Sequence, residues 1–393
     1  LTKNPIDIKK PGNELSIKIF HIGILLLASA PSISFLFLTI SAIGGTLNRK
    51  DNYFKDKYNL PFLLASILMV INCLFITIRT NLIYNQDPSL AWIGLLNWIP
   101  FFWCFWSFQI YLKNETLRIQ AAKYFLIGSV PVLLSGFTQY FLGWYGPYEI
   151  FNKLIIWYQR PLIDGAGVTG LFNNYNYSGA WLSIVLALIV GLFFKSANNK
   201  NQKLITLIFI FAFIYMIILT TSRNALLAVL ITIISLIPIK KIRFLFISVF
   251  AGLGFLITTL IPIFPSNIQN SIFTFIPSSL LVKTTLNSIN DLNSLPRIEL
   301  WLKSIKLIKS NLLIGYGGGS FSDLYHLNNG QFEGMQHSHN LILEIAFNYG
   351  LPSSILIIGG MLFVLLKSYS GLKSNRKESH LKIKKNFQEF NNA

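Results

Sequence analysis

Apolar residues fill most of this chain in long stretches that short polar segments separate. A helix needs about 20 apolar residues to cross the hydrocarbon core of a bilayer, where backbone polar groups can be satisfied only within the helix. The pattern predicts about ten such helices. Their ranges are 17–47 as two short spans, then 60–79, 89–112, 124–143, 177–194, 204–220, 224–238, 244–262 and 339–366.

The first predicted stretch decides the topology. Residues 17–47 are too long for one crossing, and Pro31 near the middle predicts a tight hairpin of two short helices. With the hairpin and a cytoplasmic N-terminus, most of the 33 lysine and arginine residues fall on the cytoplasmic side, as the positive-inside rule requires. A single crossing at 17–47 would place the basic loops outside.

Composition supports an all-α polytopic membrane protein. The chain is 53% hydrophobic and only 12% charged, with a mean hydropathy of +0.54. Its net charge of +18 does not indicate nucleic acid, because the basic residues separate apolar stretches instead of gathering on one soluble face. Cys73 and Cys104 lie inside apolar stretches, so neither a disulfide framework nor a zinc site is expected.

Two segments on the predicted outer side are too long to be simple connections, 144–176 and 263–338. The second contains RIELWLKSIKLIKSNLL, which predicts an amphipathic helix at the outer membrane interface or above a cavity. Its predicted apolar stripe is Ile298, Trp301, Leu302, Ile305, Ile308 and Leu312. Its predicted polar face is Glu299, Lys303, Lys306 and Ser310.

Polar side chains concentrate where this outer loop re-enters the membrane, in MQHSHNLILEIAFNYGLP at 335–352. One interpretation is a helix cap, with Ser338 or Asn340 binding free N–H groups. A second is a metal site built on His337 and His339, which would need a third ligand. The candidates for that ligand are His326, Glu333 and Glu344. A third is a general base, because the ordinary pKa of histidine lies near working pH.

Two arginines on the predicted outer side favour a catalytic site over a purely structural role for this region. Arg223 ends one predicted span and Arg297 begins the amphipathic helix, so both can face the same outer cavity as His339. Either one alone is explained by a side chain reaching toward the membrane interface. A guanidinium group, however, grips phosphate bidentately without a metal.

Other phosphate chemistries lack their residues. GYGGGSF at 315–321 has no following Lys-Ser/Thr, so it is predicted to be a tight loop and not a phosphate-binding loop. The chain contains no Asp-x-Asp pair to hold a nucleotide-sugar through a metal. No ATP site is visible, so any transfer must use an already activated donor.

At this point the sequence resembles the O-antigen ligase and polymerase superfamily of bacterial membrane glycosyltransferases. The resemblance covers roughly 165–355. It rests on GLFNNYNYSGAW at 170–181, TSRNALLA at 221–228, PRIELW, LLIGYGGGSF and HSHNLILEIAFNYGLPSS, in that order. The most specific part is His339-Asn340, followed after nine residues by Gly350. Ser353 stands where glycine or threonine is more usual, and the family commonly has about twelve spans.

The resemblance implies a metal-independent, inverting transferase that needs no cofactor. Its donor would be a glycan on polyprenyl diphosphate, and its acceptor a sugar hydroxyl of lipid A core or of another glycan. It would act at the periplasmic face of the bacterial inner membrane. His339 would be the base, Arg223 and Arg297 would hold the diphosphate, and the second-rank candidates are His337, Arg160 and Glu344.

The expected organisation follows from these assignments. We expect a cytoplasmic N-terminus at 1–16 and N-terminal transmembrane helices at 17–164. A ligase-like membrane domain at 165–366 would include the periplasmic loop 263–338, and a basic cytoplasmic tail would occupy 367–393. Ligase and polymerase activities stay open, as does a polyprenyl-glycan flippase or transporter. Leu1 in place of methionine leaves open an alternative start or a fragment.

Overall fold

The computed structural model describes residues 11–391 except 50, 80–87, 163–165, 196–199, 237–295, 331 and 333, and beyond residue 371 it describes the backbone alone. The predicted span at 244–262 and the first part of the predicted outer loop, 263–295, lie outside the described residues.

The described chain is mostly helical, with one small sheet. Seven of its helical segments are long and apolar enough to cross a membrane. The prediction of an all-α multi-pass membrane protein is confirmed, whereas the predicted number of about ten spans is not. The seven are Pro31–Asn48, Leu60–Ile78, Pro88–Leu112, Glu115–Leu142, Tyr175–Lys195, Lys200–Leu219 and Leu341–Gly371.

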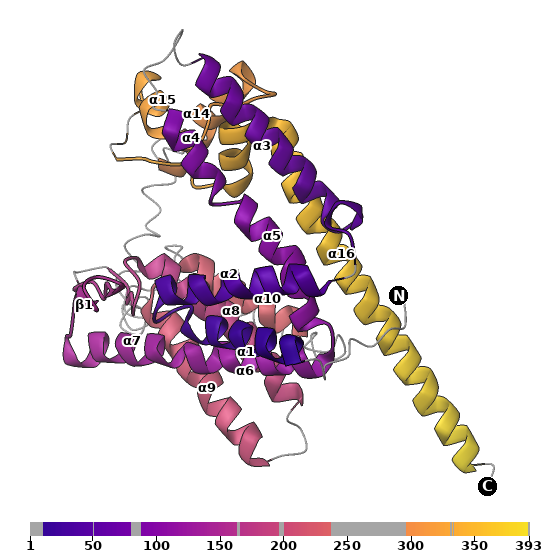
Figure 1. Cartoon of the computed structure of the whole chain (residues 1–393). Helices are drawn as coiled ribbons and strands as arrows, with labels where there is room; N and C mark the ends of the chain where they lie inside the picture. The colour runs from indigo at the N-terminus through magenta and orange to yellow at the C-terminus, as the bar shows by residue number, and fades with distance from the viewer. Residues whose placement is uncertain are drawn as a thin grey trace, which may run out of the picture. The chain divides into compact units, whose positions relative to one another are not determined.

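The chain folds into two compact units, each made of two separate segments (Figure 1). Unit 1 is Leu1–Asn48 with Phe108–Asn287, and unit 2 is Arg49–Ser107 with Ser288–Ala393. The described elements of unit 1 are α1 (Pro11–Leu26), α2 (Pro31–Asn48), η2 (Phe108–Leu112), α6 (Glu115–Gly128), α7 (Val130–Leu142), β1 (Tyr148–Ile150), β2 (Ile155–Trp157), α8 (Tyr175–Lys195), α9 (Lys200–Leu219) and α10 (Arg223–Leu236). Those of unit 2 are η1 (Tyr53–Lys55), α3 (Leu60–Arg79), α4 (Pro88–Leu95), α5 (Ile99–Ser107), α14 (Pro296–Ser310), α15 (Phe321–Leu327) and α16 (Leu341–Asn391).

The first hairpin of unit 1 has the predicted form. Helix α1 ends at Leu26, and α2 begins at Pro31, whose missing N–H and fixed φ suit a first helical position. The two helices pack side by side. The Ser34 hydroxyl donates to the Gly23 carbonyl oxygen at 2.7 Å and ties them together.

The predicted span at 124–143 begins earlier in the structure, as two helices in series. Asn114 caps α6 by accepting a hydrogen bond from the Leu117 N–H at 2.8 Å. Helix α7 follows after Ser129, with Pro131 in its first turn. Residues 113–123, which separate two of the predicted spans, are therefore mostly helical, because a strong N-cap starts the helix ahead of the apolar run.

Behind these helices, α8 packs against α9 and α10 around buried Leu182, Leu186, Phe213 and Ile217. The β1–β2 hairpin lies in the connection between α7 and α8. Its strands are antiparallel, and its register pairs Tyr148 with Trp157 and Ile150 with Ile155.

In unit 2, α3 packs along α16 around a core that includes Met69, Phe102 and Tyr349. The predicted span at 89–112 is divided in the structure into α4, α5 and the short η2. The last span begins at Leu341, close to the predicted start. Its helix continues to Asn391, through the segment that the sequence assigned to a cytoplasmic tail.

Helix α14 confirms the predicted helix, and the structure shows which of its residues are buried. The buried residues are Leu300, Ser304, Leu307 and Ile308, while Trp301, Leu302 and Ile305 of the predicted stripe are exposed. Glu299, expected on the polar face, is only 8% exposed. Apolar residues cover more than half of the circumference of this helix, so their spacing alone does not decide which arc faces inward.

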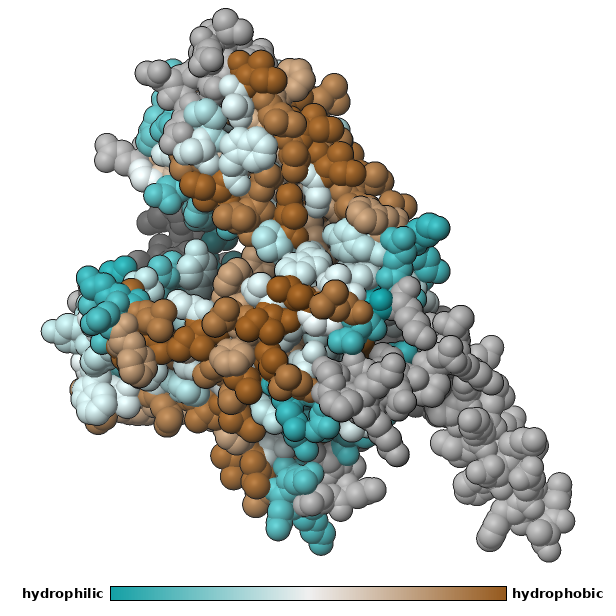
Figure 2. Space-filling model, viewed as in Figure 1, coloured by the Kyte–Doolittle hydropathy of each residue, from teal (hydrophilic) through white to brown (hydrophobic). Residues whose placement is uncertain are grey.

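Apolar side chains also cover much of the outer surface of both units. Figure 2 shows them over α3 in unit 2 and over α2 in unit 1. A surface of this kind is expected where lipid replaces water as the solvent. Exposed examples are Leu60, Leu64, Ile67, Ile71 and Phe75 on α3, and Phe35, Leu36, Ile40 and Ile43 on α2.

Candidate functional site

The start of α16 in unit 2 holds the polar turn that the sequence singled out. Asn340 precedes the helix, and its Oδ1 accepts hydrogen bonds from the N–H groups of Ile342 at 3.0 Å and Leu343 at 3.3 Å. These are donors that the first turn of a helix leaves without an internal partner. The predicted cap is therefore present at Asn340.

The carboxylate of Glu344 closes the turn from inside the helix. Its Oε2 accepts the backbone N–H of Ser338 at 2.8 Å and lies 3.1 Å from the Ser338 hydroxyl. Its Oε1 accepts from Nδ2 of Asn348, one turn further along, at 2.9 Å. Ser338 is fully buried. Glu344 thus positions the residues on either side of Ser338, because both of its carboxylate oxygens accept hydrogen bonds from neighbouring groups.

His339 is presented to solvent by this turn. Its φ of +53° lies in the left-handed region, which few residues other than glycine adopt, although histidine is among the more tolerant. Such backbone strain persists only where surrounding contacts hold it, and it clusters at functional sites. The rings of His337 and His339 lie 4.3 Å apart between centroids, and both residues are exposed.

The surroundings favour the neutral form of His339. Its pKa is lowered from the ordinary value of 6.5, first because neighbouring groups remove part of the water around the ring. The charges of His337 and Arg297 lower this pKa further, and Glu344 opposes them. A neutral imidazole can accept a proton, so the turn presents a base. Arg297, in the first turn of α14, belongs to the same electrostatic site.

Two interactions join α14 to α15 and to the residues that follow α15. The Tyr325 hydroxyl of α15 donates to Oε2 of buried Glu299 at 3.0 Å and accepts the Phe332 N–H at 3.2 Å. Nζ of Lys303 donates to the Asn328 carbonyl oxygen at 2.5 Å. Arg297 itself is exposed, two residues before Glu299. The buried tyrosine–glutamate pair therefore anchors the helix end that carries the arginine.

The glycine-rich stretch supports the base of the same site. The N–H groups of Tyr316 and Gly317 donate to the carbonyl oxygens of Phe347 and Asn348, each at 2.8 Å. Gly350 interrupts α16 with φ +81° and ψ 159°, a conformation that side chains disfavour. A Cβ atom there would overlap the carbonyl oxygen of Leu313. The predicted tight loop is confirmed, and its function in the structure is to pack against the break in α16.

The other two predicted arginines lie in unit 1. Arg223 begins α10 and is exposed. The preceding Ser222 donates its hydroxyl to Oδ1 of Asn176 at 3.0 Å, which joins the TSRN and NNYNYSG motifs. The backbone of Arg160 is held by Thr169 and Gln139, while its side chain is exposed. The structure thus groups Arg297 with His337, His339 and Glu344, and Arg223 and Arg160 belong to the other unit.

The metal interpretation of the histidine pair gains no third ligand. Within the described ranges, no three His, Cys, Asp or Glu side chains lie together as a metal site would need. Glu333, one of the proposed third ligands, lies outside the described residues.

Comparison with known families now bears on this geometry. Residues 207–358 match the family model described as O-antigen ligase. The matched O-antigen ligase segment covers less than half of the chain, and it includes Arg223, Arg297, His337, His339 and Glu344 but not Arg160. No curated protein matches the chain.

This match confirms the resemblance that the sequence motifs indicated. It supports a function of the general O-antigen ligase and polymerase type, whose family members are glycosyltransferase-like enzymes, in a chain with several helices that could cross a membrane. Sequence reasoning missed the hydrogen-bonding role of Asn348 and the Glu299–Tyr325 pair. The four-residue spacing of Glu344 and Asn348 on a helix was a signal for the first. No local pattern connects Glu299 to Tyr325, 26 residues away.

Proposed function

We propose that this protein transfers a glycan from polyprenyl diphosphate onto a sugar hydroxyl at the periplasmic face of the bacterial inner membrane. The observation that carries the proposal is the left-handed turn that exposes His339, with an exposed Arg297 near enough for its charge to lower the pKa of that histidine. A base and an anion-binding group are the two functions that this reaction requires. The family match gives the same reaction class.

His339 acts as the base. Its ring accepts the proton of the acceptor hydroxyl as the oxygen approaches the anomeric carbon, a contribution typically worth about 10² to 10⁴ in rate. The turn fixed by Glu344 and Asn340 holds the imidazole before substrate arrives. The ring of His337 lies against that of His339 and contributes to lowering the pKa of His339.

Arginine binds the leaving group. As the bond between the anomeric carbon and the diphosphate oxygen breaks, the electron pair moves to that oxygen, and Arg297 receives the growing negative charge. Arg223 is the second diphosphate ligand in this proposal, by its match to the family motif, and Arg160 is a weaker candidate. A planar guanidinium makes paired hydrogen bonds to phosphate oxygens.

The atoms balance without a cofactor. The acceptor O–H bond breaks, a new glycosidic C–O bond forms, and the proton goes to His339. Polyprenyl diphosphate leaves from the opposite side of the anomeric carbon, so the configuration inverts. The sugar–phosphate bond is already activated, and the arginines supply positive charge, so we propose that neither ATP nor a metal takes part.

The acceptor distinguishes two forms of this activity. A ligase would use lipid A core, and a polymerase would use another repeat unit. The glycan profile of a deletion strain separates them. Core without polymer indicates a ligase, and single repeats attached to core indicate a polymerase.

The proposal is tested by replacing His339 with alanine. Transfer from lipid-linked donor should fall about 10²- to 10⁴-fold at matched membrane expression, while donor binding remains, because the phosphate contacts are intact. The matched control is His326→Ala, an exposed histidine of α15 in the same unit. Full transfer by the His339 variant would contradict the assignment. His337→Ala should have the milder effect, since it changes only the surroundings of the base.

A further inference from the structure

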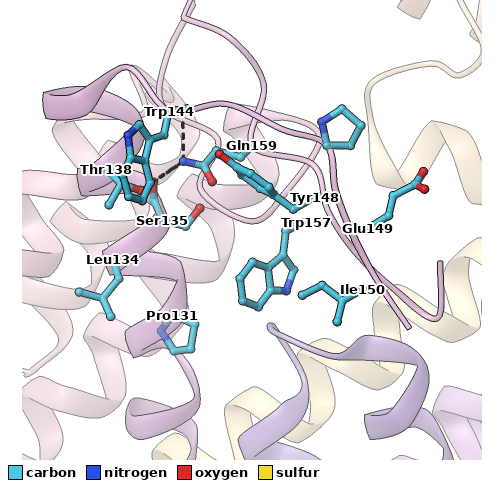
Figure 3. Close-up of a pocket in the computed structure, with 11 residues that line it drawn as sticks. Pro131, Leu134, Ser135, Thr138, Trp144, Tyr148, Glu149, Ile150, Trp157 and Gln159 are labelled. Atoms are coloured by element: carbon cyan, nitrogen blue, oxygen red, sulfur yellow. Dashed lines mark hydrogen bonds between the residues drawn. The ribbon is translucent and has the colours of Figure 1, made fainter. Parts of the chain in front are cut away.

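Unit 1 contains a cavity of about 1020 Å³ that none of the proposed catalytic or diphosphate-binding residues lines. It lies between α7 and the β1–β2 hairpin, in a part of the chain that the family match does not cover (Figure 3). Cavities of roughly 300 to 1,000 Å³ are typical of small-molecule sites. It is lined by Pro131, Leu134, Ser135, Thr138, Trp144, Pro147, Tyr148, Glu149, Ile150, Trp157 and Gln159.

Three aromatic side chains dominate the lining. Tyr148 and Trp157 face each other across the hairpin register, and Trp144 lies toward the other end of the cavity (Figure 3). The indole N–H of Trp157 donates to the Ser29 carbonyl oxygen at 2.7 Å, which fixes that ring. Trp144 is 56% exposed and Tyr148 39% exposed. The rings are thus partly fixed and available to a ligand.

One polar group in the lining has no partner. The Ser135 hydroxyl oxygen is buried, makes no hydrogen bond within the described residues, and belongs to a side chain only 9% exposed. A buried hydroxyl without a partner is costly, and in native proteins it is uncommon. Beside it, Nε2 of Gln159 is held by the carbonyl oxygens of Ser135 at 3.0 Å and Trp144 at 3.1 Å. The unused hydroxyl indicates a ligand with hydrogen-bonding groups.

The lining therefore combines two features. The faces of aromatic rings carry partial negative charge and attract C–H groups, which a pyranose ring presents on its apolar face. The hydroxyl of Ser135 can bind a hydroxyl at the edge of that ring. A prenyl or acyl chain would fill the apolar part but would leave Ser135 unsatisfied.

We propose that this cavity binds a pyranose ring of the glycan that the enzyme transfers or extends. The inference rests on the proposed function for the identity of the glycan, and it adds a carbohydrate subsite outside the catalytic residues. Tyr148 and Trp157 supply the stacking surface, and Ser135 supplies a hydrogen bond. The loop from Trp144 belongs to the segment that the sequence predicts to face outside, where the glycan would be.

Saturation-transfer NMR on the purified full chain tests the site, in a detergent whose headgroup is not a sugar. The probes are methyl α-glucopyranoside, methyl α-galactopyranoside and N-acetylglucosamine. At least one should receive saturation on its ring C–H protons, and Tyr148→Ala should reduce that signal at least fivefold. The matched control is Tyr158→Ala, because Tyr158 is 40% exposed beside the same hairpin but does not line the cavity.

Ser135→Ala separates ligand binding from folding. It removes a hydroxyl that has no hydrogen-bond partner among the described residues, so the melting temperature should not fall, while sugar affinity should. Three outcomes would overturn the proposal. They are no saturation of any of the three sugars, equal loss in the Tyr148 and Tyr158 variants, and Tyr148-dependent saturation of geranylgeraniol alone, which would indicate a lipid chain.

A transfer assay distinguishes this inference from the proposed function. If both hold, Tyr148→Ala raises the KM for the glycan and leaves kcat nearly unchanged, while His339→Ala lowers kcat. If the wild type binds sugar at the cavity but transfers no glycan, the proposed function is contradicted and the sugar subsite is still supported. Transfer with an unchanged KM in Tyr148→Ala would remove the subsite and leave the proposed function.

Discussion

The carboxylate of Glu344 holds the backbone of Ser338 at 2.8 Å, six residues earlier in the chain, and so fixes the turn between His337 and His339. This bond crosses the start of a helix, and its donor is fully buried. The geometry of the proposed base therefore depends on the side chain of Glu344, whose two carboxylate oxygens accept hydrogen bonds from Ser338 and Asn348.

Replacing Glu344 with alanine should disturb both the turn and the fold. The Ser338 N–H and Asn348 Nδ2 would lose their acceptors, at a cost of about 1–3 kcal/mol for each buried group. We expect a lower melting temperature and reduced transfer. Glu344→Gln should recover most of both, because Asn348 can turn its unpartnered Oδ1 toward the new amide. Glu14→Ala is the control, since that exposed carboxylate pairs only with Lys18 among the described groups.

The pH dependence of transfer should report the charge of Arg297. The pKa of His339 lies below its ordinary value of 6.5. The acidic limb of kcat/KM should therefore have its midpoint at a pH below 6.5. Arg297→Gln removes a positive charge and should move the limb toward higher pH. Arg297→Lys keeps the charge, so the acidic limb should stay at the same pH. Transfer should still fall nearly as far as in Arg297→Gln, because lysine lacks the paired N–H groups with which a guanidinium binds phosphate. Unchanged rates in the lysine variant would argue that this arginine does not grip diphosphate.

The same lowered pKa of His339 should make the folded protein less stable at acidic pH. Folding favours neutral His339, so its contribution is present above the unfolded pKa of 6.5 and is lost as pH falls through the folded-state value.

Gly350→Ala should prevent normal folding of unit 2. The positive φ disfavours alanine, and its Cβ would overlap the Leu313 carbonyl oxygen, which belongs to the rigid loop before Gly315. Gly359→Ala in the same helix meets no neighbouring atom and should be neutral or stabilising. Detergent-solubilised yield and melting temperature measure both. Equal behaviour of the two variants would show that the break in α16 is dispensable.

Transfer in purified membranes should survive EDTA, because the proposal assigns the diphosphate charge to arginines. The measurement is product formed from lipid-linked donor before and after chelation. Loss of activity that one divalent ion restores would contradict the metal-independent mechanism and return attention to His337 and His339 as ligands.

Membrane orientation can be tested with two exposed residues. In a chain without Cys73 and Cys104, Ser310→Cys on α14 should react with an impermeant thiol reagent in intact spheroplasts, and Lys200→Cys at the start of α9 should not. The first lies in the predicted outer loop and the second in a predicted inner one. Reversed labelling would place the site on the cytoplasmic side.

The sequence by itself determined that this is a helical multi-pass membrane protein and that it resembles the O-antigen ligases. It also determined the helical hairpin at Pro31, the amphipathic helix at Arg297 and the cap before α16. These features are encoded locally, by runs of apolar residues, by capping residues and by motifs within one segment. Even the loop at 315–321 could be predicted, since its glycines exclude a regular helix.

Only the tertiary structure decided which face of α14 turns inward and that Glu299 on this helix is buried. It also decided that Glu344 positions the turn at Ser338 and that Ser135 lines a cavity. Each depends on partners distant in the chain, Tyr325 for Glu299 and the β1–β2 hairpin for Ser135. Apolar spacing sets the period of a helix but not its rotation when most of its circumference is apolar. Rotation is fixed by the hydrogen bonds that buried polar groups must find, and those partners come from other elements of the fold.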